Sequence, residues 1–555
     1  MKELQVRDKG KRNISVYKLV GCGLDLEIKN DYENLKGIIT GWSLNIYNEK
    51  MYNGDSFDKL LKVLRQLVVN YNLTQYSVNK KDILVIYIDN LDKIRGFFED
   101  YITNDFTHYV QIFNCIEFRD ISTWNKELHR AKEIAEYAQF LIEYLFEPEK
   151  YFYLTPNQQV RRKISKRVKN EQDNVAARLF PDSYEYDYIR SCLYGGLCYC
   201  PRPFDKIEEP IIEIDLDSAY IWSFLTQQHC MSLLYRVDST KWKDYLDSDK
   251  GSFGRYYLKF FGNTLKLSWL KDMYGVEYIH NEINEGYYML TNVDLKIIIS
   301  LTDKIEVKCK SLYEVDLDYL PEYVRDVLVE EYLKKEELKQ TLGSDNPKTK
   351  IQKVRVNGIY GDSIRKYDDT FDIKRAKDTA VLIPQWGIFT TGYTKSILIG
   401  LGLQLDGWYY SDTDSIYCKD TPKNRKIIEE YNKIIREETK SFCDRFGYDY
   451  SKLSKLGTFE IKNEITIFRA IGNKMYAYKR KNGKIKLVAA GSSKDTVDID
   501  DSIFDLYKIP VGTRVFGFIN DKSYFEIVLK DEDAELMQEY LIKRKALEEM
   551  QKKKR

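Results

Sequence analysis

The sequence predicts a multidomain protein of mixed class, with α/β and α+β parts. Its length of 555 residues allows about three to four domains, each with a core of its own. The composition, 43% hydrophobic and 31% charged, is typical of a folded globular protein without a long disordered tract. Strand-like and helix-like patterns alternate in the N-terminal part, and a later β-rich stretch is followed by long helical patterns.

Residues 1–150 form the first predicted domain. Runs of apolar and β-branched residues indicate strands at 17–28 and 82–90. Apolar residues at every third or fourth position indicate helices at 56–71 and 127–146. This alternation predicts an α/β or α+β domain.

The predicted secondary structure changes twice along the rest of the chain. The basic segment 156–170 has the composition of a linker or exposed connector, and a β-rich pattern then extends to about residue 320. Helical patterns at 319–342 and 349–361 are separated by the breaker "GSDNPK", which predicts a helical hairpin. The last residues, 533–555, have the pattern of a charged helix.

Charge and cysteine content exclude several classes of protein. The net charge is +1, so no overall positive field indicates a nucleic-acid partner. Two basic clusters, 161–169 and 552–555, fit either phosphate contacts or a solvated helix face and tail. The nine cysteines lack zinc-site spacing and favour reduced structural thiols. No apolar run approaches the ~20 residues that span a membrane and no signal-peptide pattern is present, so we expect a cytoplasmic protein without membrane contact.

Three aspartates interrupt apolar strand patterns. Asp412 and Asp414 lie in "GWYYSDTDSIYCKD", which reads as two short strands around a tight turn, and Asp215 ends the apolar run "PIIEID". A half-buried carboxylate is costly unless it is paired or binds a metal ion. If these strand ends meet, their hard oxygen ligands suit Mg²⁺, and two such ions about 4 Å apart can support an in-line displacement at phosphorus.

The segment "KVRVNGIYG" lies between the aspartates in the sequence. On a helix, Lys353, Asn357 and Tyr360 fall at positions i, i+4 and i+7, which share one face. A lysine, an amide and an aromatic ring on one stripe could neutralise a triphosphate and flank a base. Taken alone, the stripe fits an exposed helix face with incidental polar residues better.

The order of these segments resembles motifs A, B and C of family B DNA polymerases. The pattern is Asp-x-x-Ser-x-Tyr from Asp215, then Lys-x-x-x-Asn-x-x-Tyr-Gly from Lys353, then Tyr-x-Asp-Thr-Asp-Ser from Tyr410. Further segments, "LYGGLCY", "NKMYAYK" and "AAGSSKD", resemble the Tyr-x-Gly-Gly loop, the Lys-x-Tyr primer-contact motif and the late palm segment of protein-primed members from phages and linear plasmids. The likeness extends from Tyr188 to the end of the chain.

The resemblance implies a role for each matching residue. Asp215 and Asp414 would bind the metal ions, with Asp412 beside them and the Leu216 carbonyl as a further ligand. The other implied contacts are with nucleotide and DNA: Tyr220 under the incoming sugar, Lys353 and Lys334 at the triphosphate, Asn357 and Tyr360 along the nascent base pair, Lys474 and Tyr476 at the primer end, and Gly195, Gly196 and Thr413 at the DNA.

The sequence departs from the family pattern at positions around these residues. Ala219 and Ile221 stand where motif A usually has leucine and proline, and Gly358 replaces a serine in motif B. Leu193 takes the place of the tyrosine in the Gly-Gly loop. None of these departures removes a metal ligand, but they concern the shape of the nucleotide pocket and the handling of the template.

The resemblance also implies a right-hand polymerase with palm, fingers and thumb, preceded by an RNase H-like domain of the exonuclease type. The implied division is 1–150 exonuclease-like domain, 151–228 linker and first palm segment with motif A, 229–320 terminal-protein-binding-like insertion and palm, 321–366 fingers with motif B, 367–480 palm with motif C and Lys-x-Tyr, and 481–555 late palm strand and thumb.

The N-terminal domain matches the exonuclease pattern only in part. Asp25 and Glu27 share one strand face and fit its first motif, and Asn90 fits its second. The aspartate required in the second motif falls at Ile94. In the third motif, Glu136 is one residue away from the expected place, about 100° around a helix. With two of four ligands absent, we expect the proofreading exonuclease to be weak or lost.

The implied activity is that of a template-directed DNA polymerase, a nucleotidyltransferase that adds dNTPs to a primer 3′-hydroxyl with two Mg²⁺ ions, or Mn²⁺ in their place. The implied setting is protein-primed replication of a viral or linear-plasmid genome, in the host cytoplasm if viral. The expected partners are template and primer DNA, dNTPs, a terminal protein and a single-stranded DNA-binding protein, and we expect a monomer.

Two alternatives stay open. The chain could be a polymerase-like scaffold that binds nucleic acid without synthesis, although the intact Asp215, Asp412, Asp414 and Lys353 count against it. It could also be a polymerase that primes without a terminal protein, because priming depends on surface geometry.

Overall fold

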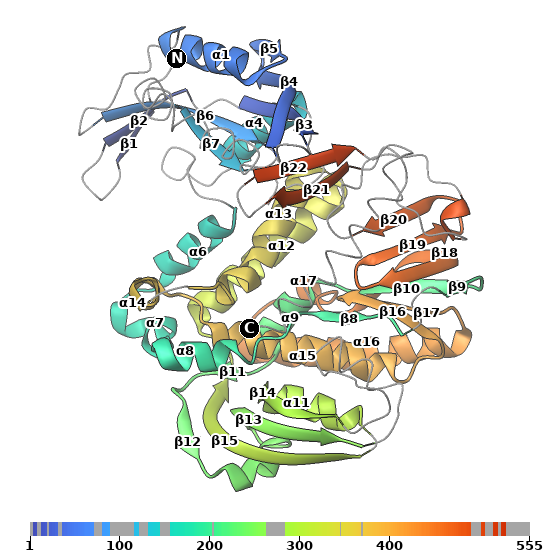
Figure 1. Ribbon diagram of the computed structural model, residues 1–555. Coiled ribbons are helices and arrows are strands. Elements are labelled where there is room, and N and C mark those ends of the chain that lie inside the picture. The colour runs from blue at the N-terminus through green and yellow to red at the C-terminus, as the bar shows by residue number, and fades with distance from the viewer. Residues whose placement is uncertain are drawn as a thin grey trace. The chain divides into compact units, whose positions relative to one another are not determined.

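A computed structural model divides the chain into two compact units (Figure 1). The first comprises Met1–Thr155, Leu342–Ile351 and Ala489–Arg555, and the second comprises Pro156–Thr341 and Gln352–Val488. The structure describes residues 4–7, 13–18, 22–31, 36–70, 80–88, 116–120, 131–144, 156–201, 205–261, 284–302, 304–344, 346–367, 370–489, 501–504, 514–519 and 523–528. The predicted C-terminal helix at 533–555 lies outside these residues.

The first unit contains a seven-stranded mixed sheet. The strand order is β1-β2-β6-β3-β4-β5, with β7 also paired to β6. β2, β3 and β7 run parallel to β6, and the other neighbours are antiparallel. The bounds are β1 Leu4–Arg7, β2 Asn13–Lys18, β3 Cys22–Asp31, β4 Lys36–Ile46, β5 Lys50–Gly54, β6 Lys80–Ile88 and β7 Ile116–Asp120.

Two helices pack on this sheet. Helix α1 (Phe57–Asn70) contacts β5, and α4 (Ala131–Tyr144) contacts β3 and β4. The approach of α4 is close, because a Cβ at Gly23 of β3 would lie 2.1 Å from the Ala131 carbonyl oxygen. The predicted mixture of strands and helices in this part of the chain is therefore present.

The C-terminal part of the chain also contributes to the first unit. Strands β21 (Arg514–Ile519) and β22 (Ser523–Val528) form an antiparallel hairpin, and β22 contacts β3 and β4. This association is not predicted from the sequence, in which residues 481–555 are expected to form a late palm strand and thumb.

The second unit is built on an eight-stranded sheet. The order is β20-β19-β18-β10-β17-β16-β8, and β9 pairs with β18. The pairs from β8 to β19 are antiparallel. The bounds are β8 Leu197–Tyr199, β9 Lys206–Ile207, β10 Ile211–Leu216, β16 Trp408–Thr413, β17 Ser415–Lys419, β18 Phe459–Gly472, β19 Met475–Arg480 and β20 Ile485–Ala489.

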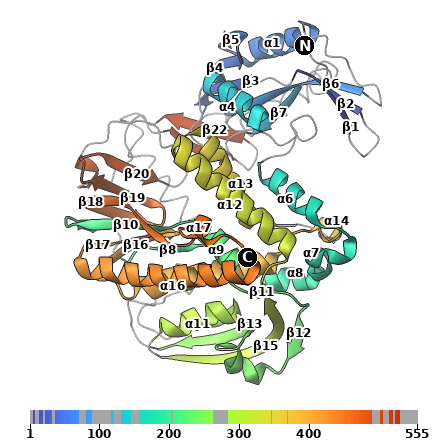
Figure 2. The ribbon, with the colours of Figure 1, turned by 180° about the vertical axis from the view of Figure 1, so that it is seen from behind.

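Three helices cover one face of this sheet. Helices α9 (Ala219–Thr226), α15 (Pro384–Gly402) and α16 (Pro422–Phe446) contact one another, and α15 also contacts β17. Figure 1 shows α15 and α16 lying along the sheet, and Figure 2 shows α16 there from the other side. The apolar side chains between these layers form the main core of the unit.

A second, five-stranded antiparallel sheet occupies the β-rich region that the sequence predicted before residue 320. Its order is β11-β15-β13-β14, with β12 paired to β15. Helix α11 (Asn292–Ser300) contacts β13, β14 and α15. The strand bounds are β11 His229–Cys230, β12 Tyr235–Val237, β13 Lys250–Phe260, β14 Asn284–Thr291 and β15 Ile305–Asp318, and the 3₁₀ helix η2 spans Ser239–Tyr245.

The remaining helices lie around the two sheets. Helices α12 and α13 form the helical hairpin predicted from the breaker between them. The bounds are α6 Pro156–Arg167, η1 Glu171–Asp173, α7 Val175–Leu179, α8 Ser183–Arg190, α12 Glu322–Leu342, α13 Pro347–Ser363, α14 Thr370–Thr379, α17 Tyr450–Leu453 and η3 Asp501–Phe504. Among the described helices, none is long and apolar enough to cross a membrane.

The basic segment 156–170 is not a linker, so that prediction is wrong. It forms helix α6, which buries Val160 and Ile164 completely. Its cations Lys163 and Arg167 form ion pairs with acidic residues of α12. These partners, which are distant in sequence, account for charges that composition alone left open to phosphate contacts.

Candidate active site

The two strands that carry Asp215 and Asp414 are direct neighbours. In the antiparallel pair β10–β17, Asp215 lies opposite Ser415. The Leu216 amide donates to the Asp414 carbonyl oxygen at 2.9 Å. The register therefore places Asp215 and Asp414 side by side at one end of the sheet.

A tight turn presents Asp414. The Asp414 amide donates to the Asp412 carbonyl oxygen at 2.8 Å, and Thr413 between them has a φ of 65°, in the left-handed region. Few residues other than glycine adopt this conformation without cost, and such strain gathers at functional sites. The hairpin tip predicted from the sequence is present.

The pKa values of both aspartates are raised above the ordinary aspartate value. Burial, followed by repulsion from Asp215, raises the pKa of Asp414 to about 7, against an opposing effect of Lys353. Burial likewise raises the pKa of Asp215 to about 6, although Lys462 and Lys353 act to lower it. Each carboxylate thus binds a proton more tightly than an exposed aspartate does.

Asp412 faces a different partner. Its Oδ1 accepts a hydrogen bond from the Thr413 hydroxyl at 3.0 Å and lies 3.6 Å from Nζ of Lys474. Among the described residues, no group of three or more His, Cys, Asp or Glu side chains gathers in a way that could hold a metal ion. The structure therefore brings two of the three predicted aspartates together, with Asp412 beside them in an ion pair.

The pair of Asp215 and Asp414 nevertheless fits a divalent cation. Mg²⁺ in nucleotide-processing sites is held by one or two carboxylates, and its other ligands are water and substrate phosphates. Two neighbouring, half-buried carboxylates supply that donor set. A bound cation would favour the ionised form of both carboxylates, against the burial that raises their pKa values.

Helix α13 presents the predicted polar stripe. Lys353 and Asn357 are exposed and Tyr360 is half-buried, whereas Val356 and Ile359 are buried. The charge of Lys353 acts on both Asp215 and Asp414, as their pKa values show. Lys353, the first residue of the stripe, therefore lies near the carboxylate pair.

Two tyrosines form a stacked pair beside the carboxylates. The ring centroids of Tyr220, on α9, and Tyr360 are 4.0 Å apart, and the angle between the ring planes is 10°. The Tyr360 hydroxyl lies 2.8 Å from that of Thr391. Burial, together with the nearby Tyr360 and Asp414, raises the pKa of Tyr220 above its usual value, so it is neutral at working pH.

The Gly-Gly loop adjoins this pair. It leads into β8, which pairs with β16 so that Leu197 lies opposite Thr413. A Cβ at Gly196 would lie 2.9 Å from the Tyr220 hydroxyl and 3.0 Å from Cγ2 of Thr413, so only glycine fits without a shift. Gly195 is exposed, with open space where a Cβ would point.

The lysine that reaches motif A from the preceding helix is Lys335. Its Nζ lies 3.2 Å from Oδ1 of Asp217 and donates to the Ser218 hydroxyl at 2.5 Å. Lys334 is instead exposed and paired with Glu337 at 3.0 Å. The side chains of these adjacent residues point about 100° apart around the helix, and the contact of Lys334 with the triphosphate stays a prediction.

The primer-contact motif divides into an exposed and a buried residue. Lys474 is 52% exposed and has a φ of 59°, and its amide donates to the Tyr410 hydroxyl at 2.6 Å. Tyr476 is only 4% exposed, and its hydroxyl accepts from Tyr417 at 3.2 Å. Tyr476 therefore packs in a tyrosine cluster beneath the turn and offers almost no surface to a primer.

The departure at Gly358 has a steric reason. A Cβ at this position of α13 would lie 1.9 Å from Oδ1 of Asn157, on α6. Asn157 thus occupies the space that the side chain of the usual serine would need.

In the first unit, two of the predicted exonuclease residues are described. On β3, Asp25 is half-buried and Glu27 is exposed; Oε2 of Glu27 lies 2.5 Å from where a Cβ of Gly41 would be. Asn90 and Ile94 lie outside the described residues. Glu136, on α4, pairs with Lys132 at 3.9 Å.

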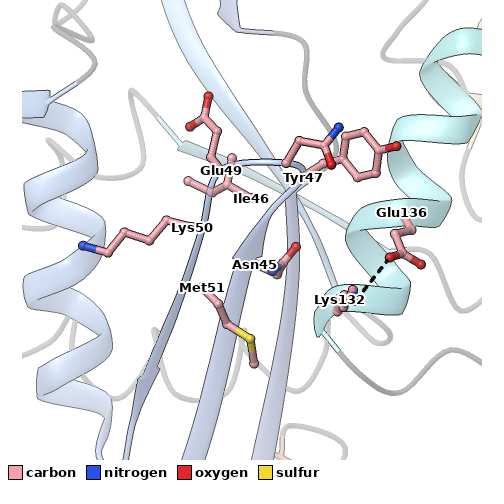
Figure 3. A pocket seen from close by; sticks show the side chains of 9 residues that line it. Asn45, Ile46, Tyr47, Glu49, Lys50, Met51, Lys132 and Glu136 are labelled. Carbon is pink, nitrogen blue, oxygen red and sulfur yellow. Dashed lines mark ion pairs between the residues drawn. The ribbon is translucent and has the colours of Figure 1, made fainter.

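A pocket of about 380 Å³ lies between the β4–β5 hairpin and α4 (Figure 3). Lys132 and Glu136 line it from the helix, and the hairpin residues 45–51 line it from the sheet. Neither Asp25 nor Glu27 is among its lining residues. The pocket therefore does not join the acidic residues of the first predicted exonuclease motif.

Comparison with solved structures finds the same fold in phi29 DNA polymerase. Its complex with primer-template DNA aligns with a TM-score of 0.58 at 11% identity, covering 92% of this chain and 99% of that chain. Its complex with single-stranded DNA aligns with a TM-score of 0.56 at 13% identity, covering 87% of this chain and 93% of that chain. Its ternary complex with primer-template DNA and incoming nucleotide substrates aligns with a TM-score of 0.54 at 12% identity, covering 91% of this chain and 98% of that chain.

The chain matches no protein-family model and no curated protein. At these identities the structural likeness concerns the fold. The resemblance indicated by the motifs is thus confirmed at that level: the chain has the fold of the family B DNA polymerase of phi29.

The raised carboxyl pKa values predict a pH-dependent stability of the metal-free protein. Between the ordinary aspartate pKa and about pH 7 the folded state holds protons that the unfolded state releases, so stability is greatest at low pH and falls as pH rises. We expect the melting temperature in EDTA to fall from about pH 5 to about pH 8, and Asp414→Asn to flatten this slope and raise the melting temperature at the upper end.

Differential scanning fluorimetry measures this effect. Asp406→Asn is the matched control, because Asp406 is exposed and paired with Lys423. An Asp414→Asn profile as steep as that of the wild type would show that the pKa of Asp414 is not raised in the folded protein.

Proposed function

We propose that this chain is a template-directed DNA polymerase that adds dNTPs to a primer 3′-hydroxyl. The observation that carries the proposal is the placement of Asp215 and Asp414 side by side, within the field of Lys353. This arrangement occurs on the fold of phi29 DNA polymerase, whose solved complexes contain primer-template DNA and incoming nucleotides.

The motif resemblance implies the proposed roles, and the placement of Asp215, Asp414 and Lys353 supports them. Asp215 and Asp414, with the Leu216 carbonyl, would hold the divalent cations. Bound Mg²⁺ would activate the attacking hydroxyl and stabilise the leaving pyrophosphate. Lys353 would neutralise the triphosphate by charge, and Asn357 on the same helix face would lie along the nascent base pair.

Tyr220 and Tyr360 would border the nucleotide. In the structure their rings lie against each other, so a nucleotide that takes this place must separate them. Tyr220 beneath the sugar would exclude a 2′-hydroxyl and favour dNTPs. Positioning and charge stabilisation supply most of the rate in phosphoryl transfer, which suits a site built from fixed side chains.

The larger parts of the molecule would take the roles that the sequence implied. The eight-stranded sheet would be the palm, and α12 with α13 the fingers. The five-stranded sheet lies in the region expected to bind a terminal protein, so we propose protein-primed replication of a viral or linear-plasmid genome. A single-stranded DNA-binding protein is a further proposed partner.

Incorporation of dNTPs tests the central proposal. On a primed template with Mg²⁺ or Mn²⁺, we expect synthesis by the wild type, and a loss of about a thousandfold or more in Asp414→Ala and in Asp215→Ala. Asp406→Ala, which removes an exposed carboxylate of the same unit, should retain activity. Equal activity in all four proteins would refute the proposed site.

The same assay separates the two alternatives. A scaffold without synthesis would bind DNA but incorporate nothing on any template. A polymerase that primes without a protein would incorporate nucleotides on unprimed templates, whereas the proposed enzyme requires a primer or a supplied terminal protein.

We further propose that the 3′–5′ exonuclease is weak or lost. Asp25 and Glu27 offer two carboxylates, whereas two cations at an exonuclease site require about four. A labelled primer incubated with the protein and Mg²⁺ should stay intact. Degradation that Asp25→Ala abolishes would contradict this part of the proposal.

A further inference from the structure

A buried carboxylate, Glu331, joins three helices of the second unit. It lies on α12 and is 3% exposed. Arg355 of α13 donates to it twice, from Nε to Oε2 at 2.9 Å and from Nη2 to Oε1 at 3.0 Å. Gln352 of α13 donates to Oε2 at 2.8 Å, and Lys163 of α6 donates to Oε1 at 2.9 Å. All these polar groups are satisfied, which buried ionic groups require.

The hydrogen bonds to Glu331 hold the buried side of α13, and Lys353 lies on the other side of this helix. Arg355 is two residues after Lys353, which is about 200° around α13. Arg355 is therefore buried against α12, whereas Lys353 and Asn357 are exposed on the opposite side. Two parallel hydrogen bonds from a planar guanidinium fix both the rotation and the axial position of the helix.

Helix α6 holds α13 from a second direction. Nη1 of Arg355 donates to Oε1 of Gln159 at 2.9 Å. Two residues earlier on α6, Asn157 lies so close to α13 that only Gly358 fits opposite it. The same arginine is thus held by α12 and α6 together, and α13 is fixed by two neighbours.

We propose that Glu331 is a positioning residue that acts through Arg355 to hold Lys353 in register with Asp215 and Asp414. The proposal rests on the proposed polymerase function, because it concerns the binding of the nucleotide triphosphate. Loss of the bidentate pair lets α13 rotate or slide. A displacement of about 1 Å at a positioned group is enough to change activity strongly.

The charge state of Glu331 keeps its ion pair with Arg355 intact. Burial alone would raise its pKa, but hydrogen bonds and charges from Arg355 and Lys163 lower the pKa to about 2. Glu331 is therefore ionised throughout the working range of a polymerase, and its effect should not vary with pH there.

Steady-state dNTP incorporation by Glu331→Gln tests the proposal, with Glu330→Gln as the matched control. Glu330 is the neighbouring residue, and it pairs with Lys163 at 2.8 Å while remaining 44% exposed. We expect Glu331→Gln to raise the KM for dNTP about tenfold with kcat within about twofold, because ground-state binding of the triphosphate is lost. Glu330→Gln should change both by less than about twofold.

A double-mutant cycle with Lys353→Ala separates positioning from a general structural effect. If Glu331 acts through Lys353, Glu331→Gln has no further effect on KM in the Lys353→Ala background. Additive effects in the cycle, or equal effects of Glu330→Gln and Glu331→Gln, would overturn the proposal.

Arg355→Lys provides a second test should Glu331→Gln fail to fold. It retains the charge but loses the planar fork, so it should give the same rise in KM and the same lack of additivity with Lys353→Ala. A wild-type protein that incorporates no dNTP would overturn the polymerase proposal itself. An active wild type with additive variants would overturn only the role of Glu331.

Discussion

The pairing of β10 with β17 is the constraint on which the site depends. It places two carboxylates at neighbouring strand ends, although their mutual repulsion and partial burial oppose this. A slip of one residue would move every side chain of β10 to the opposite face. The register is secured on both faces: Ile212 and Ile214 lie in the main core, and Glu213 on the other face accepts hydrogen bonds from Tyr417 and Tyr478 at 2.8 and 3.1 Å.

The surrounding elements offset part of the free-energy cost of placing two carboxylates together. Lys353 offsets part of the repulsion, yet its helix belongs to a different segment of the fold and must be held in place. The contacts of α13 with α6 and α12 do this with a bidentate ion pair and a close approach at Gly358. A site that concentrates negative charge thus depends on a rigid positive partner, whose position is set by residues that do not face the site.

Two features of the site could be predicted from the sequence because they are local, whereas the meeting of Asp215 with Asp414 joins distant segments and was expected only from the motif resemblance. The hairpin tip at Asp412–Asp414 and the stripe of Lys353, Asn357 and Tyr360 both follow from short-range periodicity. The choice between Lys334 and Lys335 could not be made in this way. One residue of register rotates a side chain by about 100°, and only the packing of α12 on Asp217 decides which lysine faces motif A.

Other features depend on contacts between distant segments. Helix α6 had visible apolar positions at Val160 and Ile164, but its charges dominated the pattern, and their acidic partners lie on α12. The burial of Tyr476 and the pairing of Asp412 with Lys474 depend on how β16 and β19 approach each other across the sheet. The contact of β22 with β3 joins the two ends of the chain, which no local pattern can show.

Binding of Mn²⁺ to the metal-free protein tests most directly the claim that Asp215 and Asp414 form a single cation site. Isothermal titration calorimetry at a pH above the raised pKa values should detect binding to the wild type and to Asp406→Asn. The account predicts that Asp215→Asn and Asp414→Asn each weaken it strongly, because each removes one of the two carboxylates that hold the cation. Undiminished binding in both variants would contradict the account.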